Sequence, residues 1–310
     1  MKYIVLLFVA FAFCACTAES NQYRISAGKV FGTYYTVTYS SANDLAAEME
    51  NAMDEVGRSL STFDSTSVIS RINRNDTTVV PDKHFMKVFN KAMEISRITG
   101  GAFDITVAPL VNLWGFGFAP ASDRDSMQVD SVREFVGYEK IRFEKGKFVK
   151  SDSRVMLDAS AIAKGYACDV VASCLDSAGV GNYLVDIGGE IVTKGVNPKG
   201  GKWKIGINVP DPDAPVSAVD SVIELSGAAV ATSGNYRQFY ESGGRKIAHT
   251  IDPRSGYPAI NPLLSATVIA SDCMTADAYA TAFMVIGDTA EINRIAGQSP
   301  DSLQWYGIVE

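Results

Sequence analysis

The second half of the chain passes through several short strand-like segments in succession, with little helical sequence between them. The strand candidates are NYLVDIGGEI (182–191), KWKIGINV (202–209), SVIELSG (221–227), AAVATSG (228–234), RKIAHTI (245–251) and LSATVIA (264–270). Strands that follow one another directly can pair antiparallel, whereas parallel pairing needs a long crossover. The pattern therefore predicts an α+β fold in which helices flank a largely antiparallel sheet.

Four longer segments have the apolar spacing of helices. They are NDLAAEMENAMDEVGRSLSTF (43–63), with Asn43 as the expected cap, KHFMKVFNKAMEISRIT (83–99), SAIAKGYACDVVASCLDSAG (160–179) and TADAYATAFMVIG (275–287). In addition, YYTVTY (34–39) alternates as a strand does and IRFEKGKFV (141–149) has the pattern of a hairpin. No internal repeat or low-complexity linker interrupts the sequence. We therefore expect residues 23–310 to form one catalytic unit, with one or two lobes.

The amino terminus has the features of a bacterial export signal. MKYIVLLFVAFAFCAC has one Lys followed by an apolar run that is short for a permanent membrane span. Its end, Phe13-Cys14-Ala15-Cys16, resembles a lipobox. We predict a lipoprotein signal peptide at residues 1–15, lipid on Cys16 and a tether at 16–22. The protein would then be exported and lipid-anchored to a bacterial membrane, facing the periplasm; an ordinary cleaved signal peptide is the alternative.

Charge and cysteine content exclude some classes of function. The chain has 28 Lys and Arg against 35 Asp and Glu, scattered without a basic stripe, so nucleic acid is not an expected partner. No CxxC pair, HExxH motif or Cys/His cluster indicates a zinc site. Cys168 and Cys174, if they share a helix, lie about 9 Å apart along it, too far for a disulfide. We expect them to be buried thiols.

One acid lies within the apolar helix near the carboxyl end. Asp277 and Thr281 are four residues apart, so on a helix they point to the same face. A carboxylate and a hydroxyl so placed can be neighbouring oxygen ligands of a hard cation such as Mg²⁺. The alternative is that Asp277 only favours the helix dipole near the amino end.

Two other segments contain candidate site residues. In VMLDASAIAKGYACD (155–169), Asp158 ends a predicted strand and Lys164 lies in the first turns of the next helix. Small residues at a helix start and a nearby lysine suit a phosphate, but a helix cap and a surface lysine fit equally well. His249 precedes a turn at a strand end and could be a base, a phosphate ligand or a turn-stabilising residue. His84 is expected on a polar, solvated helix face.

An aromatic and glycine-rich segment separates the second helix from the hairpin. GGAFDITVAPLVNLWGFG (100–117) and the following Phe118 place three phenylalanines and Trp114 among glycines. Such a surface suits a planar heterocycle, and it also suits an ordinary core. Composition leaves both interpretations open.

Taken together, eight segments resemble the ApbE family of FAD:protein FMN transferases, which are often exported as lipoproteins. In family order they are GKVFGTYYTV, LSTFDSTSVISRIN, GGAFDITVAPLVNLWGFG, LDASAIAKGYACD, YLVDIGGEI, ATSGNYRQF, HTIDPRSGYP and ADAYATAFMVIG. They cover essentially all of the chain after the tether. The resemblance implies an ApbE-like fold over residues 23–310.

The resemblance also implies site residues. Mg²⁺ would be held by the side chains of Asp277 and Thr281 and by the backbone carbonyl at Ala161. His249 would take part in the transfer step, and Asp277 is a catalytic residue through the metal. The positions implied to contact FAD are Phe31, Phe63, Ala102, Phe103, Asp104, Asp158, Lys164 and Ile251. Phe31 stands where the family commonly has Met and Phe63 where it commonly has Tyr, so a phenol hydroxyl is missing at Phe63.

The implied reaction is Mg²⁺-dependent transfer of FMN from FAD to a Thr or Ser hydroxyl of another protein, with release of AMP. The implied acceptor is a subunit of a membrane respiratory flavoprotein complex. Two alternatives stay open from the sequence: an FAD pyrophosphatase, in which water replaces the hydroxyl, and a flavin-binding lipoprotein without turnover. Oxygen ligands would accept Mn²⁺ as well as Mg²⁺.

Overall fold

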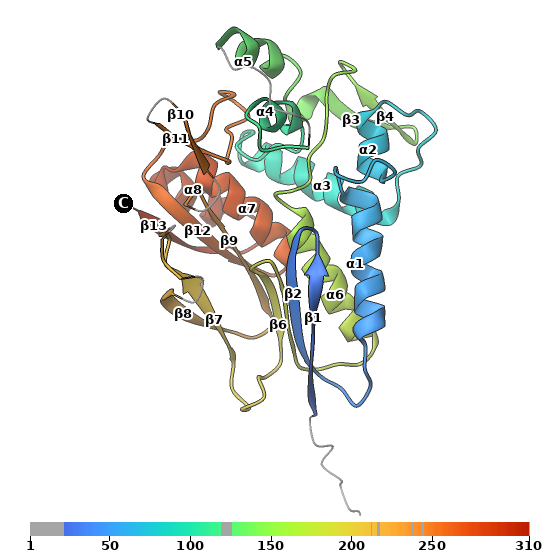
Figure 1. Cartoon of the computed structure of the whole chain (residues 1–310), viewed down its shortest axis with the longest axis vertical. Helices are drawn as coiled ribbons and strands as arrows, with labels where there is room; N and C mark the ends of the chain where they lie inside the picture. Colours follow the sequence, from blue (N-terminus) through green and yellow to red (C-terminus); the bar gives the residue numbers. More distant parts are fainter. Residues whose placement is uncertain are drawn as a thin grey trace, which may run out of the picture.

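Seven strands from both halves of the chain form one antiparallel sheet (Figure 1). The computed structural model describes residues 22–118, 126–211, 213–215, 218–236, 239–242 and 245–309. In spatial order the strands are β1 (Tyr23–Val30), β2 (Thr33–Ser40), β5 (Tyr183–Ile187), β6 (Glu190–Lys194), β9 (Ala228–Gly234), β12 (Leu263–Ala270) and β13 (Gln304–Val309). Every neighbouring pair is antiparallel. The predicted fold class is confirmed.

Three helices, α1 (Ala46–Leu60), α6 (Ala163–Ser177) and α7 (Cys273–Ile286), pack in a layer on one face of this sheet. On α1 the buried apolar residues Met49, Met53, Val56 and Leu60 recur at helical spacing and form one stripe. On α7 almost every residue is buried, because the helix packs against β9, β12, α6 and α3 together. The acid at position 277 therefore lies inside the core layer.

A two-stranded hairpin covers part of the opposite face of the sheet. Its strands are β7 (Trp203–Asn208) and β8 (Val219–Leu225), which pair with each other and not with the seven-stranded sheet. Trp203 and Ile205 pack on Ile191, Val230 and Ile269 of the main sheet. Both strands were predicted, but their separation from the main sheet was not.

Apart from α8 (Thr289–Gln298), which lies beside α7, the remaining elements lie toward one end of the helical layer (Figure 1). They are α2 (Val68–Asn73), α3 (Lys83–Ile98), α4 (Ala108–Leu113), α5 (Ser126–Arg133), the 3₁₀ helix η1 (Tyr138–Lys140), and the hairpins β3 (Ile141–Glu144) with β4 (Lys147–Lys150) and β10 (Phe239–Ser242) with β11 (Arg245–Ala248). A small second core joins Leu110, Val129 and Ile251. The indole N–H of Trp114 donates to the Gly256 carbonyl at 2.8 Å and ties the segment after α4 to the turn after β11.

Two expected helix starts differ from the structure. The predicted cap at Asn43 is wrong: α1 begins at Ala46, and the Asp44 carboxylate accepts from the Ala46 N–H at 3.1 Å. The Tyr39 hydroxyl accepts from the Leu45 N–H at 3.0 Å, so this N–H is bonded to β2 at the residue before the helix. The strand predicted to end at Asp158 is also absent from this described segment, where only an isolated bridge joins Met156 to Val107. The helix then begins at Ala163.

His84 lies in a buried position, so the expectation of a solvated histidine was wrong. Its Nδ1 is 2.9 Å from the Tyr166 hydroxyl, and its Nε2 is 3.2 Å from a Glu55 carboxylate oxygen. His84 is 6% exposed because α3 packs against α1 and because Tyr166 of α6 contacts the ring. The polar residues next to His84 in the sequence indicated exposure, but its contacts with Tyr166 and Glu55 form only in the tertiary structure.

The three cysteines after residue 22 are free, but they differ in burial. Cys168 and Cys273 are fully buried, whereas Cys174 is half-buried and so corrects the expectation for that residue. Burial raises the pKa of the Cys168 thiol and raises that of Cys273 well above its usual value. We expect a maleimide to label Cys174 at least about 100-fold faster than the other two in the native protein, because thiolate formation requires access to water. Peptide mass spectrometry measures the three rates, and equal labelling would contradict this burial.

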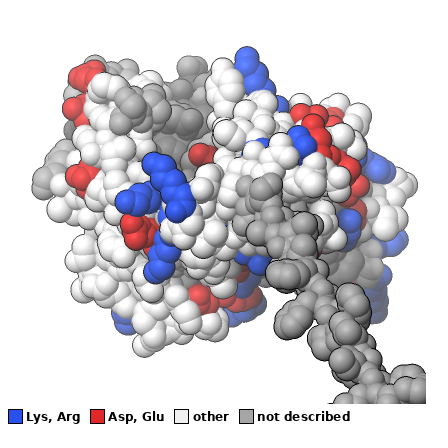
Figure 2. Space-filling model, turned by 90° about the horizontal axis from the view of Figure 1, so that it is seen from below, with Lys and Arg blue, Asp and Glu red and all other residues white. Residues whose placement is uncertain are grey.

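The predicted signal peptide at residues 1–15, the lipidated Cys16 and the tether up to residue 21 lie outside the described residues. Among the residues that are described, no helix combines the length and the hydropathy that a membrane span requires. Figure 2 shows Lys and Arg lying beside Asp and Glu on the face that it draws, without a continuous basic stripe over the described part of that face. The absence of a nucleic-acid partner stays a prediction from charge.

Candidate active site

Asp277 lies where α7 crosses α6 most closely. Its side chain is buried, and Oδ2 accepts a hydrogen bond from the Gly165 N–H at 3.0 Å. A Cβ at position 165 would lie 2.3 Å from the Cys273 carbonyl oxygen and 2.8 Å from the Asp277 Cβ. Only glycine therefore lets the two helices approach to this distance. Burial raises the pKa of Asp277, and the nearby Lys164 ammonium opposes that shift.

Lys164 forms an ion pair with Glu190, an acid at the start of β6. Glu190 is 3% exposed, and its Oε2 has no hydrogen-bond partner within the described chain. Burial, together with the charge of Asp277, raises the pKa of Glu190 to about 8. Burial alone would lower the pKa of Lys164, but Asp277 and Glu190 outweigh it and raise the pKa. The Lys164 ammonium thus offsets the negative charge of two buried acids, Asp277 and Glu190.

Thr281 lies one turn beyond Asp277 on α7. Its hydroxyl is 3.2 Å from the hydroxyl of Ser233 on β9. Between Cys273 and Val285, Thr281 is the only residue of α7 that is partly exposed. The face of α7 that contains Asp277 and Thr281 therefore begins in the core and becomes accessible toward Ser233.

The oxygen atoms at this crossing suit a hard divalent cation. Asp277 provides a carboxylate and Thr281 a hydroxyl, while Ala161 lies just before α6, four residues from Gly165. Such a set of carboxylate, hydroxyl and carbonyl oxygens matches the ligands that Mg²⁺ prefers. Nowhere in the described residues do three His, Cys, Asp or Glu side chains gather as a metal cluster. A cation here would therefore depend strongly on the one carboxylate of Asp277.

The segment that contains Asp104 lies beside the segment that leads into α6. The Asp158 N–H donates to the Ile105 carbonyl at 2.8 Å, and an Asp158 carboxylate oxygen accepts from the Ser160 N–H at 2.8 Å. One Asp104 carboxylate oxygen accepts from the Thr106 N–H and hydroxyl within its own loop, and the other accepts from the N–H of Tyr138 at the start of η1. Its carboxylate therefore holds this loop in shape beside the position expected for FAD.

Asp104 makes the stability of the protein depend on pH. Burial raises its pKa to about 6, above that of an unfolded Asp, so the folded state binds the extra proton. This contribution to stability is present at low pH and is lost as pH rises through about 6. Between pH 5 and pH 7 we expect the free energy of unfolding of the wild type to fall by about 1 kcal/mol relative to Asp104→Asn. Urea unfolding at both pH values measures this difference, and parallel pH profiles would contradict it.

His249 and Ile251 lie in the segment after β11, next to the residues that follow α4. The His249 and Phe116 rings meet edge to face, with centroids 6.3 Å apart. Ile251 is buried in the small core with Leu110. Ala102 and Phe103 are buried as well. The structure thus brings the 102–118 and 249–251 segments together, and a ligand would meet the buried members of this set mainly through their backbone.

Phe31 and Phe63 are exposed aromatic residues at two separate turns. Phe31 is 38% exposed, has φ +49° and occupies the β1–β2 turn with Gly32. Phe63 is 78% exposed and meets Phe118 edge to face at 6.5 Å. Such surface aromatics can contact a planar ring. Phe63 also connects its turn to the end of the 102–118 segment.

A cavity of about 280 Å³ lies between the end of α2 and the β3–β4 hairpin. Its lining includes Ile72 of α2 and Phe148 and Lys150 of β4, and none of the predicted site residues. The Lys150 ammonium donates to the Ile72 carbonyl at 2.8 Å, and burial lowers its pKa to about 8. Lys150 therefore joins α2 to the β3–β4 hairpin beside a cavity whose lining does not include Asp277 or Thr281.

The chain belongs to the ApbE family, whose family model matches residues 31–306. It is 37% identical to the FAD:protein FMN transferase of Haemophilus influenzae, over 94% of this chain and 90% of that protein. The structure of the flavin transferase ApbE from Vibrio cholerae is similar, with a TM-score of 0.81, 34% identity and coverage of 92% of this chain and 97% of that one. The apo flavinyl transferase ApbE of Pseudomonas stutzeri also has a TM-score of 0.81, at 31% identity, over 93% and 92% of the two chains.

Sequence reasoning missed four residues at the helix crossing. Gly165, Glu190 and Ser233 contact Lys164, Asp277 or Thr281, and Asp169 contacts the amino end of α7. Gly165, Glu190 and Ser233 lie inside segments that resemble the family, yet a glycine in a helix and an acid after Gly-Gly have ordinary structural explanations. For Asp169 the sequence shows only an acid four residues after a helical lysine-glycine pair, and this does not indicate a contact with another helix.

Proposed function

We propose that the protein transfers FMN from FAD to a Thr or Ser hydroxyl of another protein and releases AMP. One observation supports this most strongly: in a member of the ApbE family, Asp277 and Thr281 occupy an oxygen-rich helix face beside Lys164. Asp277, Thr281 and the Ala161 carbonyl would hold Mg²⁺. When bound, the ion neutralises the pyrophosphate of FAD and stabilises charge on the leaving oxygen.

The residues of the chain divide the remaining work. The acceptor hydroxyl attacks the phosphorus on the FMN side, a new O–P bond forms, and the bond to the AMP oxygen breaks. His249 accepts the hydroxyl proton or orients the hydroxyl. Lys164, which Glu190 holds in place, offers positive charge to the phosphates. Phe31, Phe63 and the 102–104 segment would contact FAD, together with Asp158 and Ile251.

The place of action and the acceptor belong to the same proposal. The lipobox-like sequence at Cys16 suits a protein anchored to a bacterial membrane on its periplasmic side. There the transferase would meet an acceptor subunit of a membrane respiratory flavoprotein complex after export. The acceptor hydroxyl would have to reach the site from its accessible side, near Thr281.

Incubation with FAD, MgCl₂ and a candidate flavoprotein subunit tests the function. We expect a fluorescent acceptor band in a denaturing gel, an acceptor mass increased by one FMN, and AMP in equal amount. EDTA and an acceptor lacking its Thr or Ser hydroxyl are the controls. Free FMN and AMP without an adduct would show a pyrophosphatase, and bound FAD without AMP would show a flavin carrier; either result contradicts the proposal.

A further inference from the structure

Asp169 of α6 binds the first turn of α7. One carboxylate oxygen accepts from the Cys273 N–H at 2.8 Å, and the other accepts from the Met274 N–H at 2.9 Å. The first N–H groups of a helix have no partner within it. Asp272 is the cap residue of α7 itself. Among these N–H groups its carboxylate accepts only from that of Thr275, at 2.9 Å. A neighbouring helix therefore supplies the acceptors for the first two N–H groups of α7.

This contact forms a regular pair with the one at Asp277. Gly165 and Asp169 are four residues apart on α6, and Cys273 and Asp277 are four residues apart on α7. Gly165 binds Asp277, while Asp169 binds the Cys273 and Met274 N–H groups, so the helices are joined at two points one turn apart. Two points fix both the distance of α7 from α6 and its rotation. That rotation determines where Asp277 and Thr281 point relative to Ala161.

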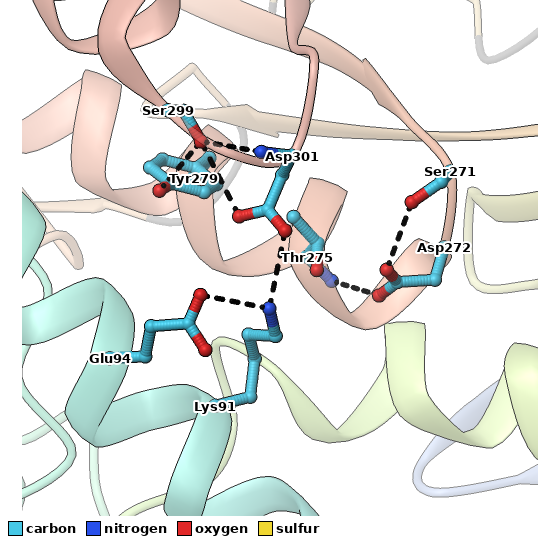
Figure 3. Close-up of polar contacts among 8 residues, drawn as sticks. All are labelled: Lys91, Glu94, Ser271, Asp272, Thr275, Tyr279, Ser299 and Asp301. Atoms are coloured by element: carbon cyan, nitrogen blue, oxygen red, sulfur yellow. Dashed lines mark hydrogen bonds and ion pairs between the residues drawn. The ribbon is translucent and has the colours of Figure 1, made fainter.

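The other side of α7 is held by an independent polar network (Figure 3). Lys91 of α3 pairs with Glu94 and, at 3.3 Å, with Asp301. Asp301 contacts Ser299, whose hydroxyl is 3.1 Å from the Tyr279 hydroxyl. This network and the apolar core keep α7 in the fold without Asp169. Loss of Asp169 should therefore turn the first half of α7 without detaching it.

We infer that Asp169 is a positioning residue that holds α7 in the rotation at which Asp277 and Thr281 can bind a divalent cation. The inference rests on the proposed function, because it concerns the metal proposed there. Two acceptor oxygens and a negative charge at the positive end of a helix make the contact strong. Residues that orient metal ligands typically contribute about 10- to 100-fold to metal affinity.

Mn²⁺ binding to the FAD-free protein, measured by calorimetry, tests this role. In Asp169→Asn the amide offers one acceptor and turns an N–H₂ group toward the other backbone N–H, so we expect the Kd for Mn²⁺ to rise about 10-fold. The Mg²⁺ concentration for half-maximal FMN transfer should rise by the same factor, while kcat at saturating Mg²⁺ stays within about threefold of wild type. Asp288→Asn is the control, because the Asp288 carboxylate also accepts a hydrogen bond from an N–H at a helix start, that of Ala290 at 2.9 Å, but in α8 and not in α7.

Three outcomes separate the possibilities. A lowered Tm with unchanged Mn²⁺ affinity would make Asp169 a purely structural residue and overturn the inference. No Mn²⁺ binding by the wild type would contradict the proposed function itself. Asp169→Glu retains the charge and both oxygens on a longer side chain and should raise the Kd about threefold. If Asp169→Asn does not fold, Asp169→Glu provides the test. Wild-type Mn²⁺ affinity in Asp169→Glu would also overturn the inference.

Discussion

Asp277→Ala is expected to lower FMN transfer by at least about 100-fold, which corresponds to roughly 2.7 kcal/mol of activation free energy. Asp277 is the only carboxylate in the proposed ligand set, so its removal takes away most of the negative charge that binds the cation. FAD binding should persist, because the residues proposed to contact FAD lie on other segments. Transfer rates at limiting and saturating Mg²⁺, with FAD affinity from flavin fluorescence, measure both effects.

Asp288→Ala is the matched control for Asp277→Ala. It removes an exposed aspartate at the cap of α8 and should leave the transfer rate within about twofold of wild type. Near-normal transfer by purified, folded Asp277→Ala at limiting Mg²⁺ would contradict the assignment of the metal ligand. A loss of FAD binding equal to the loss of transfer would instead indicate a role in holding FAD.

Gly165→Ala is expected to have the second largest effect. The new Cβ would lie 2.3 Å from the Cys273 carbonyl oxygen and 2.7 Å from its carbon, both backbone atoms that move only with the helix. Overpacking of this kind costs about 1–3 kcal/mol. Because α7 must shift, the Gly165 contact with Asp277 is lost as well, and we expect transfer to fall at least about 10-fold. Chemical denaturation and kinetics on the same preparation measure the two losses.

Gly297→Ala provides the control for a glycine in a helix. A Cβ at Gly297, in α8, would meet no atom within 4 Å. Alanine is the better helix former, so this variant should gain up to about 1 kcal/mol and keep its activity. Wild-type stability in Gly165→Ala would show that the helices can separate at little cost. It would then remove the argument that glycine sets the approach of α6 to α7.

Much of the fold could be predicted because local patterns and tertiary structure agree. Consecutive strand candidates led to an antiparallel sheet, and the largely apolar sequence around Asp277 indicated the helix that lies in the core as α7. The position of the β7–β8 hairpin could not be predicted, since KWKIGINV has the same alternation as a strand of the main sheet. His84 was placed wrongly for a related reason: its burial depends on Tyr166 and Glu55, which are distant in the sequence.

The site was predicted only in part. The pairing of Asp277 with Thr281 follows from helix geometry, and the resemblance to the ApbE family supplied Ala161 and the FAD positions. The buried acid Glu190 follows Gly188-Gly189, where the sequence indicates an exposed turn, and only the packing of α6 against β6 buries it. Asp169 likewise belongs to one helix and acts on another. Contacts between elements carry no signal in a single sequence.

The central claim is that a divalent cation binds between Asp277, Thr281 and the carbonyl at Ala161, next to FAD. Crystals grown with FAD and Mn²⁺, with data collected at the manganese absorption edge, test it most directly. We expect one strong anomalous peak within about 2.5 Å of an Asp277 carboxylate oxygen and beside the pyrophosphate. A peak at another group of residues, with Asp277 still bound only to the Gly165 N–H, would contradict the account.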